Sequence, residues 1–301
     1  MENLHQIPCF RDSISYIYLE RGRLDRDSKS IAFHDKEGIT RIPASSSAVI
    51  LLGPGTKVTH AAISTAADNN CLLIWVGEEG VRFYAYGSGG TRNSDLLLHQ
   101  ASLCSDSNLR LGVVRRMYAM RFGEEPDPEF SVERLRGLEG ARVRKLYEEM
   151  SNKTGIRWRG RSYDRGNWSC ADPVNRALSA ANSCLYGICH AAILSVGLSP
   201  GLGFIHTGKQ LSFVYDIADL YKADLTIPMA FDLAVAGVPQ IETRARWLCR
   251  DVFRKTRIMK RIIPDIFNIL GIMTDISDSP YDWDPARPGP LWDPSYLEGD
   301  D

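Results

Sequence analysis

The chain has 301 residues, of which 44% are hydrophobic and 24% charged, a balance typical of a folded globular protein long enough for two domains. It holds no run of about 18 uninterrupted apolar residues, and its first ten residues lack the basic and apolar regions of a signal peptide. The seven scattered cysteines form no C-x-x-C pair, which argues against a disulfide framework and a zinc knuckle. We therefore expect a cytoplasmic protein without a membrane partner.

The net charge of −1 conceals a strong internal asymmetry. Residues 110–165 carry fourteen Lys and Arg against nine Asp and Glu, and residues 244–261 carry eight against one. Residues 275–301 reverse the balance, with one basic residue against eight acidic ones. This distribution predicts a polyanion-binding surface that is confined to the part of the chain beyond its N-terminal third.

Short runs of β character alternate with Gly, Asp and Ser turns up to about residue 90. We expect strands within residues 13–20, 30–35, 39–43, 48–53, 71–77 and 81–87. One short helix over residues 59–70 interrupts them, with Thr59 as its N-cap. The pattern predicts a small, sandwich-like β-sheet domain over residues 1–90.

After the GSGG sequence at residues 87–90, apolar residues recur at helical spacing. We expect helices at residues 95–104, 109–122, 132–150, 173–197, 229–236, 241–256 and 257–271. The predicted fold class is therefore α+β, with a larger all-α bundle over residues 91–275. Residues 276–301 are rich in Pro and Asp and are predicted to form a flexible tail, whose few aromatic residues suit docking on a partner or on DNA.

The segment at residues 203–223, GFIHTGKQLSFVYDIADLYKA, carries the most distinctive polar pattern. With Ser212 as its N-cap, residues 213–222 are predicted to form a helix that places Asp216 and Asp219 one turn apart on the same side. His206 lies in the Gly-flanked loop before it, so the three side chains can converge on a metal ion. The alternative is an ordinary solvated helix face and an unrelated loop histidine.

A third carboxylate is available from RGLEGARVR, where Glu139 lies between Gly137 and Gly140. Each glycine inside a helix lowers its stability by about 1 kcal/mol relative to alanine. Two of them beside one glutamate indicate that another group approaches this part of the helix closely.

Arginines and aromatic residues alternate from Arg157 to Trp168. Such a run suits phosphate binding together with base stacking. The alternative is a salt-bridged helical surface. We favour the nucleic-acid interpretation because it agrees with the candidate metal site at His206, Asp216 and Asp219.

RGLEGARVR and FIHTGKQLSFVYDIADLYK, together with LLGPGT and WVGEEGVRFYAYG upstream, closely resemble the CRISPR-associated integrase Cas-one of the subtype I-E branch. The resemblance runs from about residue 13 to residue 265, in matching order and spacing. It implies a metal-dependent DNA integrase that inserts new spacers into a CRISPR array. The metal ligands that it implies are Glu139, His206 and Asp219, and the wider catalytic set adds Asp216 and Lys222. The DNA-binding positions that it implies are Arg82, Arg136, Arg161, Tyr163, Tyr186, Lys209 and Tyr215.

Two carboxylates and one imidazole favour Mg²⁺ or Mn²⁺ over structural zinc. The ion would polarise the target phosphodiester, and a DNA 3′-hydroxyl would attack it without a covalent enzyme intermediate. Asp216 has two open roles, holding metal-bound water or orienting Lys222. Lys209 and Lys222 have the alternative of being ordinary surface charges, and Tyr186 that of a core residue.

The resemblance also implies double-stranded DNA partners, namely prespacer and CRISPR repeat, and a homodimer made through the β domains. Two such homodimers would be bridged by a Cas-two dimer. Two other functions remain open. A structure-selective nuclease would need the same ligands but would use water as its nucleophile, and a non-catalytic scaffold would carry the basic helices without needing the ligands.

Overall fold

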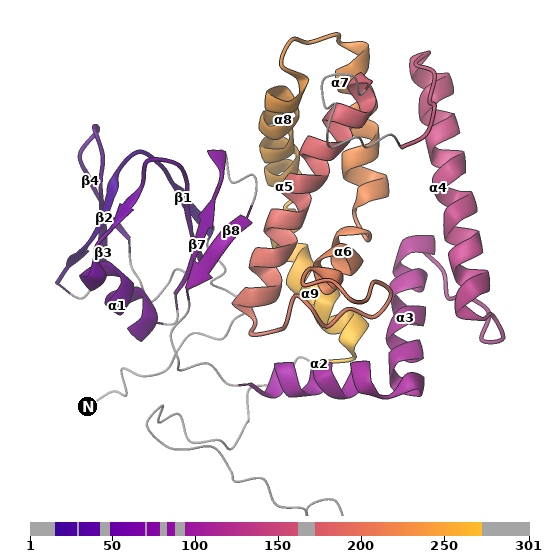
Figure 1. Cartoon of the computed structure of the whole chain (residues 1–301), viewed down its shortest axis with the longest axis horizontal. Coiled ribbons are helices and arrows are strands. Elements are labelled where there is room, and N and C mark those ends of the chain that lie inside the picture. The colour runs from indigo at the N-terminus through magenta and orange to yellow at the C-terminus, as the bar shows by residue number, and fades with distance from the viewer. Residues whose placement is uncertain are drawn as a thin grey trace, which may run out of the picture.

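Strands dominate the chain up to Gly87 and helices dominate it from Asp95 onward, which confirms the predicted α+β class. The structure is a computed structural model that describes residues 16–28, 30–42, 49–69, 71–78, 83–87, 94–161 and 172–272. Arg82, Tyr163 and the predicted tail at residues 276–301 lie outside these ranges. In Figure 1 the strands lie beside the helices.

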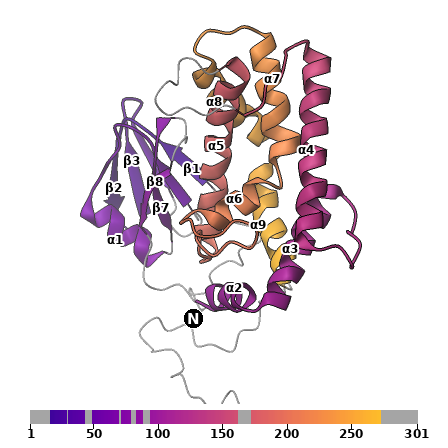
Figure 2. The ribbon, with the colours of Figure 1, turned by 45° about the vertical axis from the view of Figure 1, so that its right-hand side comes forward.

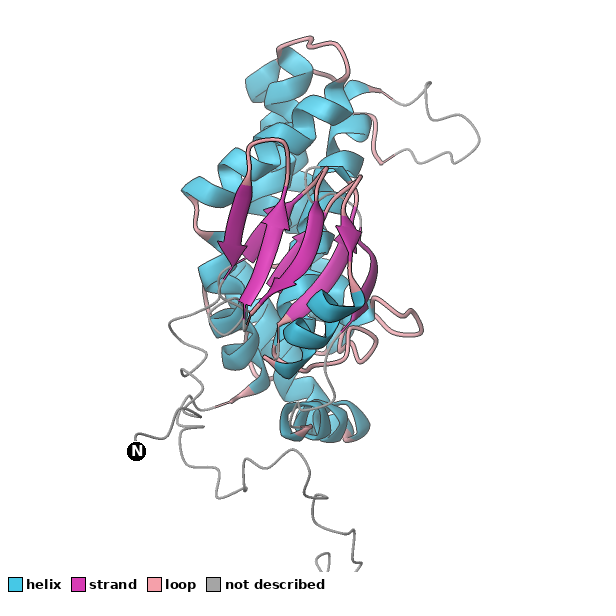
Figure 3. Ribbon diagram, turned by 90° about the vertical axis from the view of Figure 1, so that its left-hand side faces the viewer, coloured by secondary structure: helices cyan, strands magenta, loops and turns pink. Residues whose placement is uncertain are grey.

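The strands form two four-stranded sheets, which Figure 3 views with the helices of residues 94–272 behind them. The first sheet has the order β1 (Tyr16–Leu19), β5 (Val49–Leu52), β7 (Leu72–Val76) and β8 (Phe83–Gly87), with only the β7–β8 pair antiparallel. The second has the order β4 (Ile39–Ile42), β3 (Ser30–His34), β2 (Arg23–Asp27) and β6 (Lys57–Val58), with only the β2–β6 pair parallel. Each predicted strand segment contains one of these strands.

Both faces of the first sheet are covered. Ile50, Leu52 and Leu73 pack against the second sheet and against helix α1 (His60–Asp68). On the other face, Ile74 belongs to a cluster that includes Leu194 of helix α5. Burial on both faces explains why β5 and β7 read as uninterrupted apolar runs instead of alternating ones.

The sequence does not predict β2, whose residues are mostly charged. Leu24 is the one fully buried side chain of that strand, and the strand is held by antiparallel pairing with β3. The cap of α1 is confirmed, because the hydroxyl of Thr59 accepts a hydrogen bond from the backbone N–H of Ala62. A helix cap can be predicted from the local sequence. A strand of charged residues cannot, because its formation depends on pairing with a partner strand.

Helix α5 (Pro173–Ser195) is the centre of the helical part. The other elements are α2 (Asp95–Ser105), α3 (Ser107–Phe122), α4 (Val132–Thr154), α6 (Ser212–Ala218), the π-helix η4 (Lys222–Thr226), α7 (Ile227–Val235), α8 (Ile241–Lys255) and α9 (Ile258–Leu270). Helix α5 packs against α6, α7, α8 and α9. Figures 1 and 2 agree that it lies between the sheets and the outer helix α4.

By length and composition α5 passes the test for a membrane-spanning helix, and it is the only such helix among the described residues. Of its most apolar window, 72% is buried inside the fold. The apolar character of α5 is therefore explained by its place between the sheets and the other helices.

The predicted helix at residues 213–222 is wrong at both ends. Helix α6 has Leu211 at its N-cap, and the Ser212 hydroxyl instead donates to the Lys209 carbonyl at 2.8 Å. The helix stops at Ala218 with Asp219 at the C-cap, and the π-helix η4 follows. Pro228, near the start of α7, has no N–H to donate to the preceding turn.

Candidate active site

A buried carboxylate organises the loop that carries His206. Asp216 of α6 is 0% exposed and accepts hydrogen bonds from the backbone N–H groups of Phe204, Ile205 and His206 at 2.6, 3.1 and 2.9 Å. Its Oδ1 also lies 2.7 Å from Nδ1 of the His206 ring. Asp216 is therefore no solvated helix residue, and its carboxylate binds the His206 loop and not Lys222.

These contacts fix the orientation of the imidazole. Because the carboxylate of Asp216 accepts, Nδ1 of His206 carries the hydrogen and Nε2 is the ring atom left to bind a ligand. The side chain of His206 is 43% exposed, and Nε2 lies 4.0 Å from Oδ2 of Asp219. A carboxylate that orients an imidazole in this way is the usual support of a metal-binding histidine.

Helices α2 and α3 hold the carbonyl groups of the same loop. Gln100, which is fully buried on α2, donates to the carbonyls of Ser199 and Leu202 and accepts from the N–H of Ser199. Arg110 of α3 donates through Nε and Nη2 to the carbonyl of Phe204 at 3.0 and 2.8 Å. The loop is thus held rigidly from both sides of its backbone.

Asp219 and Lys222 form a close ion pair, with Nζ of Lys222 2.5 Å from Oδ1 of Asp219. Burial lowers the pKa of Lys222, but the charge of Asp219 and a hydrogen bond with Tyr186 more than compensate, so the net effect is a raised pKa. Lys222 therefore stays a cation at neutral pH.

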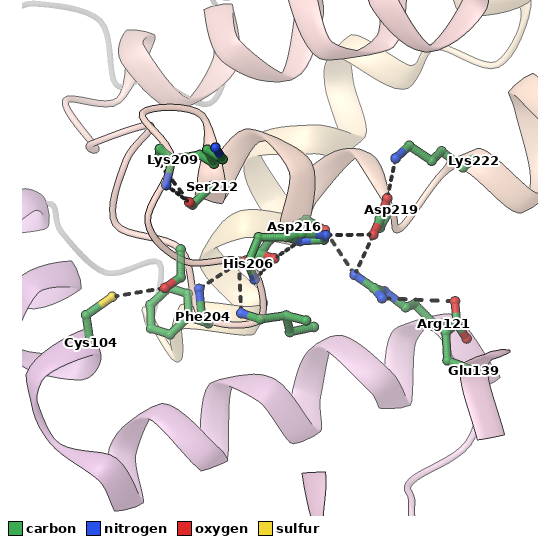
Figure 4. Close-up of polar contacts among 12 residues, drawn as sticks. Cys104, Arg121, Glu139, Phe204, His206, Lys209, Ser212, Asp216, Asp219 and Lys222 are labelled. Carbon is green, nitrogen blue, oxygen red and sulfur yellow. Dashed lines mark hydrogen bonds and ion pairs between the residues drawn. The ribbon is translucent and has the colours of Figure 1, made fainter. Parts of the chain in front are cut away.

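Glu139 faces Asp219 from α4, with Arg121 of α3 between them (Figure 4). Nη1 of Arg121 lies 4.0 Å from Oε1 of Glu139, and its Nη2 lies 3.7 Å from Oδ2 of Asp219. Arg142, one turn along α4, binds the other oxygen of Glu139 through Nε at 3.0 Å. The two carboxylates thus belong to one network of ion pairs across three helices.

The glycines beside Glu139 face open space. A Cβ built on Gly137 would meet no described atom within 4 Å, and one on Gly140 would meet only Arg144 Nη1, at 3.4 Å. The close approach that these glycines predict is therefore not made by the described part of the protein itself.

Two tyrosines extend the site along α5 and α6. The rings of Tyr186 and Tyr215 meet edge to face at 5.1 Å, and Tyr215 lies 5.8 Å from the ring of His206. Nζ of Lys222 lies 4.8 Å from the centre of the Tyr186 ring. Both tyrosines are partly exposed, and Tyr186 also packs against the hydrophobic core of the helical part, so the alternative of a core residue stays open for it.

The other predicted DNA contacts lie around this cluster. Arg136 is exposed on α4, one turn before Glu139, and Lys209 is exposed in the loop between His206 and α6. Arg161 donates to Asn175 near the start of α5, eleven residues and about 16 Å of helix from Tyr186. The structure therefore brings Glu139, His206, Asp216, Asp219, Lys222, Tyr186 and Tyr215 together and leaves Arg161 further away.

The donor set matches a hard divalent cation in its chemistry. It offers carboxylate oxygens from Glu139 and Asp219 and one oriented imidazole nitrogen from His206. Among the described residues, however, no three His, Cys, Asp or Glu side chains lie close enough together to hold a metal ion. The space between the two carboxylates holds the guanidinium of Arg121, a cation in contact with both.

The sequence analysis does not predict three residues of this site: Arg121, Gln100 and Arg110. Arg121 falls on the buried face of α3 with Val114, Met117 and Tyr118, and a charged residue on an apolar stripe signals a buried ion pair. That signal is available from the sequence. Gln100 and Arg110 bind backbone carbonyls about 100 residues away, for which no local pattern exists.

Comparison with known proteins agrees with this arrangement. The family model described as CRISPR associated protein Cas1 matches residues 15–125 and 124–240. The CRISPR-associated endonuclease Cas1 2 of Thermus thermophilus is 49% identical over 299 residues, which cover 99% of this chain and 91% of that protein. The CRISPR-associated endonuclease Cas1 of Escherichia coli is 47% identical over 269 residues, 89% of this chain and 88% of that one.

Solved structures share the fold. The crystal structure of a TtCas1–DNA complex has 50% sequence identity and a TM-score of 0.79, covering 87% of this chain and 98% of that chain. A CAS1 protein from Thermotoga maritima, with 16% identity and a TM-score of 0.63, covers 85% and 96% and shows the same fold. The family match and the close relatives both span most of this chain, which therefore belongs to the Cas1 family of CRISPR-associated proteins.

Proposed function

We propose that this chain is a divalent-metal-dependent DNA integrase of CRISPR adaptation, of the subtype I-E branch, that joins 3′-hydroxyl ends of prespacer DNA to the CRISPR repeat by transesterification. The observation that carries the proposal is the orientation of His206 by Asp216 beside Asp219, in a chain whose relatives are named CRISPR-associated endonucleases. An imidazole fixed by a buried carboxylate and faced by Asp219, with Glu139 across Arg121 from Asp219, has the composition of a catalytic metal site.

Glu139, His206 and Asp219 would hold Mg²⁺ or Mn²⁺, which would supply Lewis-acid stabilisation of charge on the phosphate oxygens. The protein's own residues then have separate tasks. Asp216 keeps the hydrogen of His206 on Nδ1, so that Nε2 stays available. Lys222 places a partly buried positive charge beside Asp219, where it would stabilise negative charge developing on the scissile phosphate.

The surface around the site suits DNA. Tyr186 lines a hollow of about 260 Å³ with Tyr84 of β8, and exposed aromatic rings provide stacking faces for bases. Arg136 and Lys209 supply exposed positive charge near the cluster. The complex of a relative with DNA supports this proposal. DNA affinity should fall steeply as salt concentration rises.

We extend the proposal to the assembly and its place in the cell. Integration at two ends of a duplex needs two active sites at a fixed separation, and the described part of this chain shows one such cluster. A homodimer, with a Cas-two dimer bridging two homodimers, would supply them in the cytoplasm. Arg82 and Tyr163 remain proposed DNA contacts.

The test is strand transfer of a short duplex with 3′-hydroxyl ends into a plasmid that carries a CRISPR repeat, with the cognate Cas-two protein and Mn²⁺ or Mg²⁺. Joined products should form with the wild type and with His60→Ala, an exposed histidine on α1 that serves as the matched control. They should vanish with His206→Ala. Equal joining by His206→Ala would show that the site is assigned wrongly.

A nuclease is the second candidate, because the relatives are named endonucleases. It would use the same residues with water as the nucleophile. Nicked or degraded plasmid without joined products would favour it. DNA bound unchanged, with no need for a divalent ion, would favour a scaffold.

A further inference from the structure

Arg121 is buried at the centre of the proposed metal site. Its side chain is 4% exposed, and its guanidinium contacts Glu139 on one side and Asp219 on the other (Figure 4). Nη2 also donates to the carbonyl of Asp216 at 3.3 Å, and the guanidinium carbon lies 5.4 Å from the centre of the Tyr118 ring. A single cation therefore bridges two of the three residues proposed to bind the metal.

The contacts of Arg121 are long for a buried arginine. Its ion pairs of 4.0 and 3.7 Å are at the outer limit for such pairs, and its Nε has no hydrogen-bond partner among the described residues. Each carboxylate meanwhile has a closer cation, Arg142 at 3.0 Å from Glu139 and Lys222 at 2.5 Å from Asp219. Arg121 is thus shared between the carboxylates and bound tightly to neither.

The charged side chains around Arg121 carry no net charge in this arrangement. Glu139 and Asp219 contact three cations, Arg121, Arg142 and Lys222, and the carboxylate of Asp216 on the His206 loop adds a third negative charge. A divalent cation added to this group would leave two uncompensated positive charges. Water screens charges poorly at a side chain that is 4% exposed, so the repulsion between the ion and Arg121 would be strong.

We propose that Arg121 is a built-in counter-ion that competes with the divalent metal for Glu139 and Asp219. The inference rests on the metal site of the proposed function. Metal binding breaks both contacts of Arg121, so the free protein binds the ion weakly. The phosphates of bound DNA supply the missing negative charge, so DNA and metal each strengthen the binding of the other by the same factor.

The opposite role is also physically reasonable. An arginine between two carboxylates could hold them in place for the metal, as a positioning residue. Removing it would then weaken metal binding. The two roles predict changes of opposite sign in the same measurement.

The experiment is a titration of the full-length protein with Mn²⁺, followed by calorimetry and by the electron paramagnetic resonance of free Mn²⁺. The variants are Arg121→Met, which removes the charge and keeps much of the volume, and Arg121→Lys, which keeps the charge. Arg142→Met is the matched control, because Arg142 binds the same Glu139 from a side chain that is 36% exposed. His206→Ala reports whether Mn²⁺ occupies the proposed site.

Without DNA, Arg121→Met should bind Mn²⁺ at least about tenfold more tightly than the wild type, because a buried like charge is gone. Arg121→Lys should stay close to the wild type, and Arg142→Met should change less than Arg121→Met because water screens its charge. A duplex with 3′-dideoxy ends, which cannot be joined, should raise Mn²⁺ affinity strongly in the wild type and much less in Arg121→Met. Weaker Mn²⁺ binding by Arg121→Met would overturn the proposal.

Failure of the metal site is distinguishable from failure of this inference. If wild type and His206→Ala bind Mn²⁺ equally, the proposed site is wrong and the inference falls with it. If the wild type binds Mn²⁺ and His206→Ala does not, but Arg121→Met does not fold, a crystal structure of the wild type with Mn²⁺ tests the inference instead. The proposal requires both Arg121 pairs to open beyond the ~4 Å limit of an ion pair, and intact pairs beside the ion would overturn it.

Discussion

Replacing Asp216 with asparagine tests how the His206 loop is held. One oxygen of Asp216 accepts from the N–H groups of Phe204 and Ile205, and the other accepts from the N–H and Nδ1 of His206. Whichever way the asparagine amide turns, its NH₂ group faces two donors. Two hydrogen bonds to a charged group, each contributing about 1.5–3 kcal/mol, are lost, so stability should fall by about 3–6 kcal/mol.

The assay combines thermal unfolding with hydrogen exchange of the loop amides. At roughly 2 °C per kcal/mol for a chain of this size, the unfolding midpoint of Asp216→Asn should fall by roughly 6–12 °C. The control is His206→Ala, which removes one of the four contacts and leaves the three backbone donors on Asp216. The amides of residues 204–206 should lose protection only in the asparagine variant. A loss of stability below about 1 kcal/mol with protection intact would refute this account of the loop.

Four further predictions concern other residues. Burial lowers the pKa of His190 to about 4, below its ordinary 6.5, so the unfolded state takes up the proton first as pH falls. The wild type should therefore lose on the order of 2 kcal/mol between pH 8 and pH 5. In urea unfolding at both pH values, His190→Leu should lose less, and an equal loss would contradict this. Gly203→Ala, whose Cβ would lie 2.4 Å from the carbonyl of His206, should be destabilised by more than about 2 kcal/mol in thermal unfolding. Gly137→Ala, in open space, should gain up to about 1 kcal/mol, and loss of strand transfer without loss of stability would show that DNA approaches there. Lys222→Met should lower the strand-transfer rate roughly a hundredfold or more, whereas Lys209→Met, at an exposed lysine, should mainly weaken DNA binding in a salt-dependent way. Equal rates for the two lysine variants would count against Lys222.

The helical part was predictable because its signals are local. Apolar residues at helical spacing located α2, α3, α4, α5, α7, α8 and α9, and the N-cap at Thr59 located α1. The break after Ala218 was not predicted, because the apolar stripe of α6 continues past it. Strand β2 was missed for a related reason, because its stability comes from pairing with β3.

The sequence by itself determined the fold class, most of the helices and the residue types of the candidate site, because periodicity, capping and motif spacing are properties of short stretches of chain. Only the tertiary structure decided how those side chains are used. It buried Asp216 against the His206 loop and placed Arg121 between Glu139 and Asp219. Ion pairs and hydrogen bonds between distant segments depend on how α3, α4 and α6 pack, and no local pattern specifies that packing.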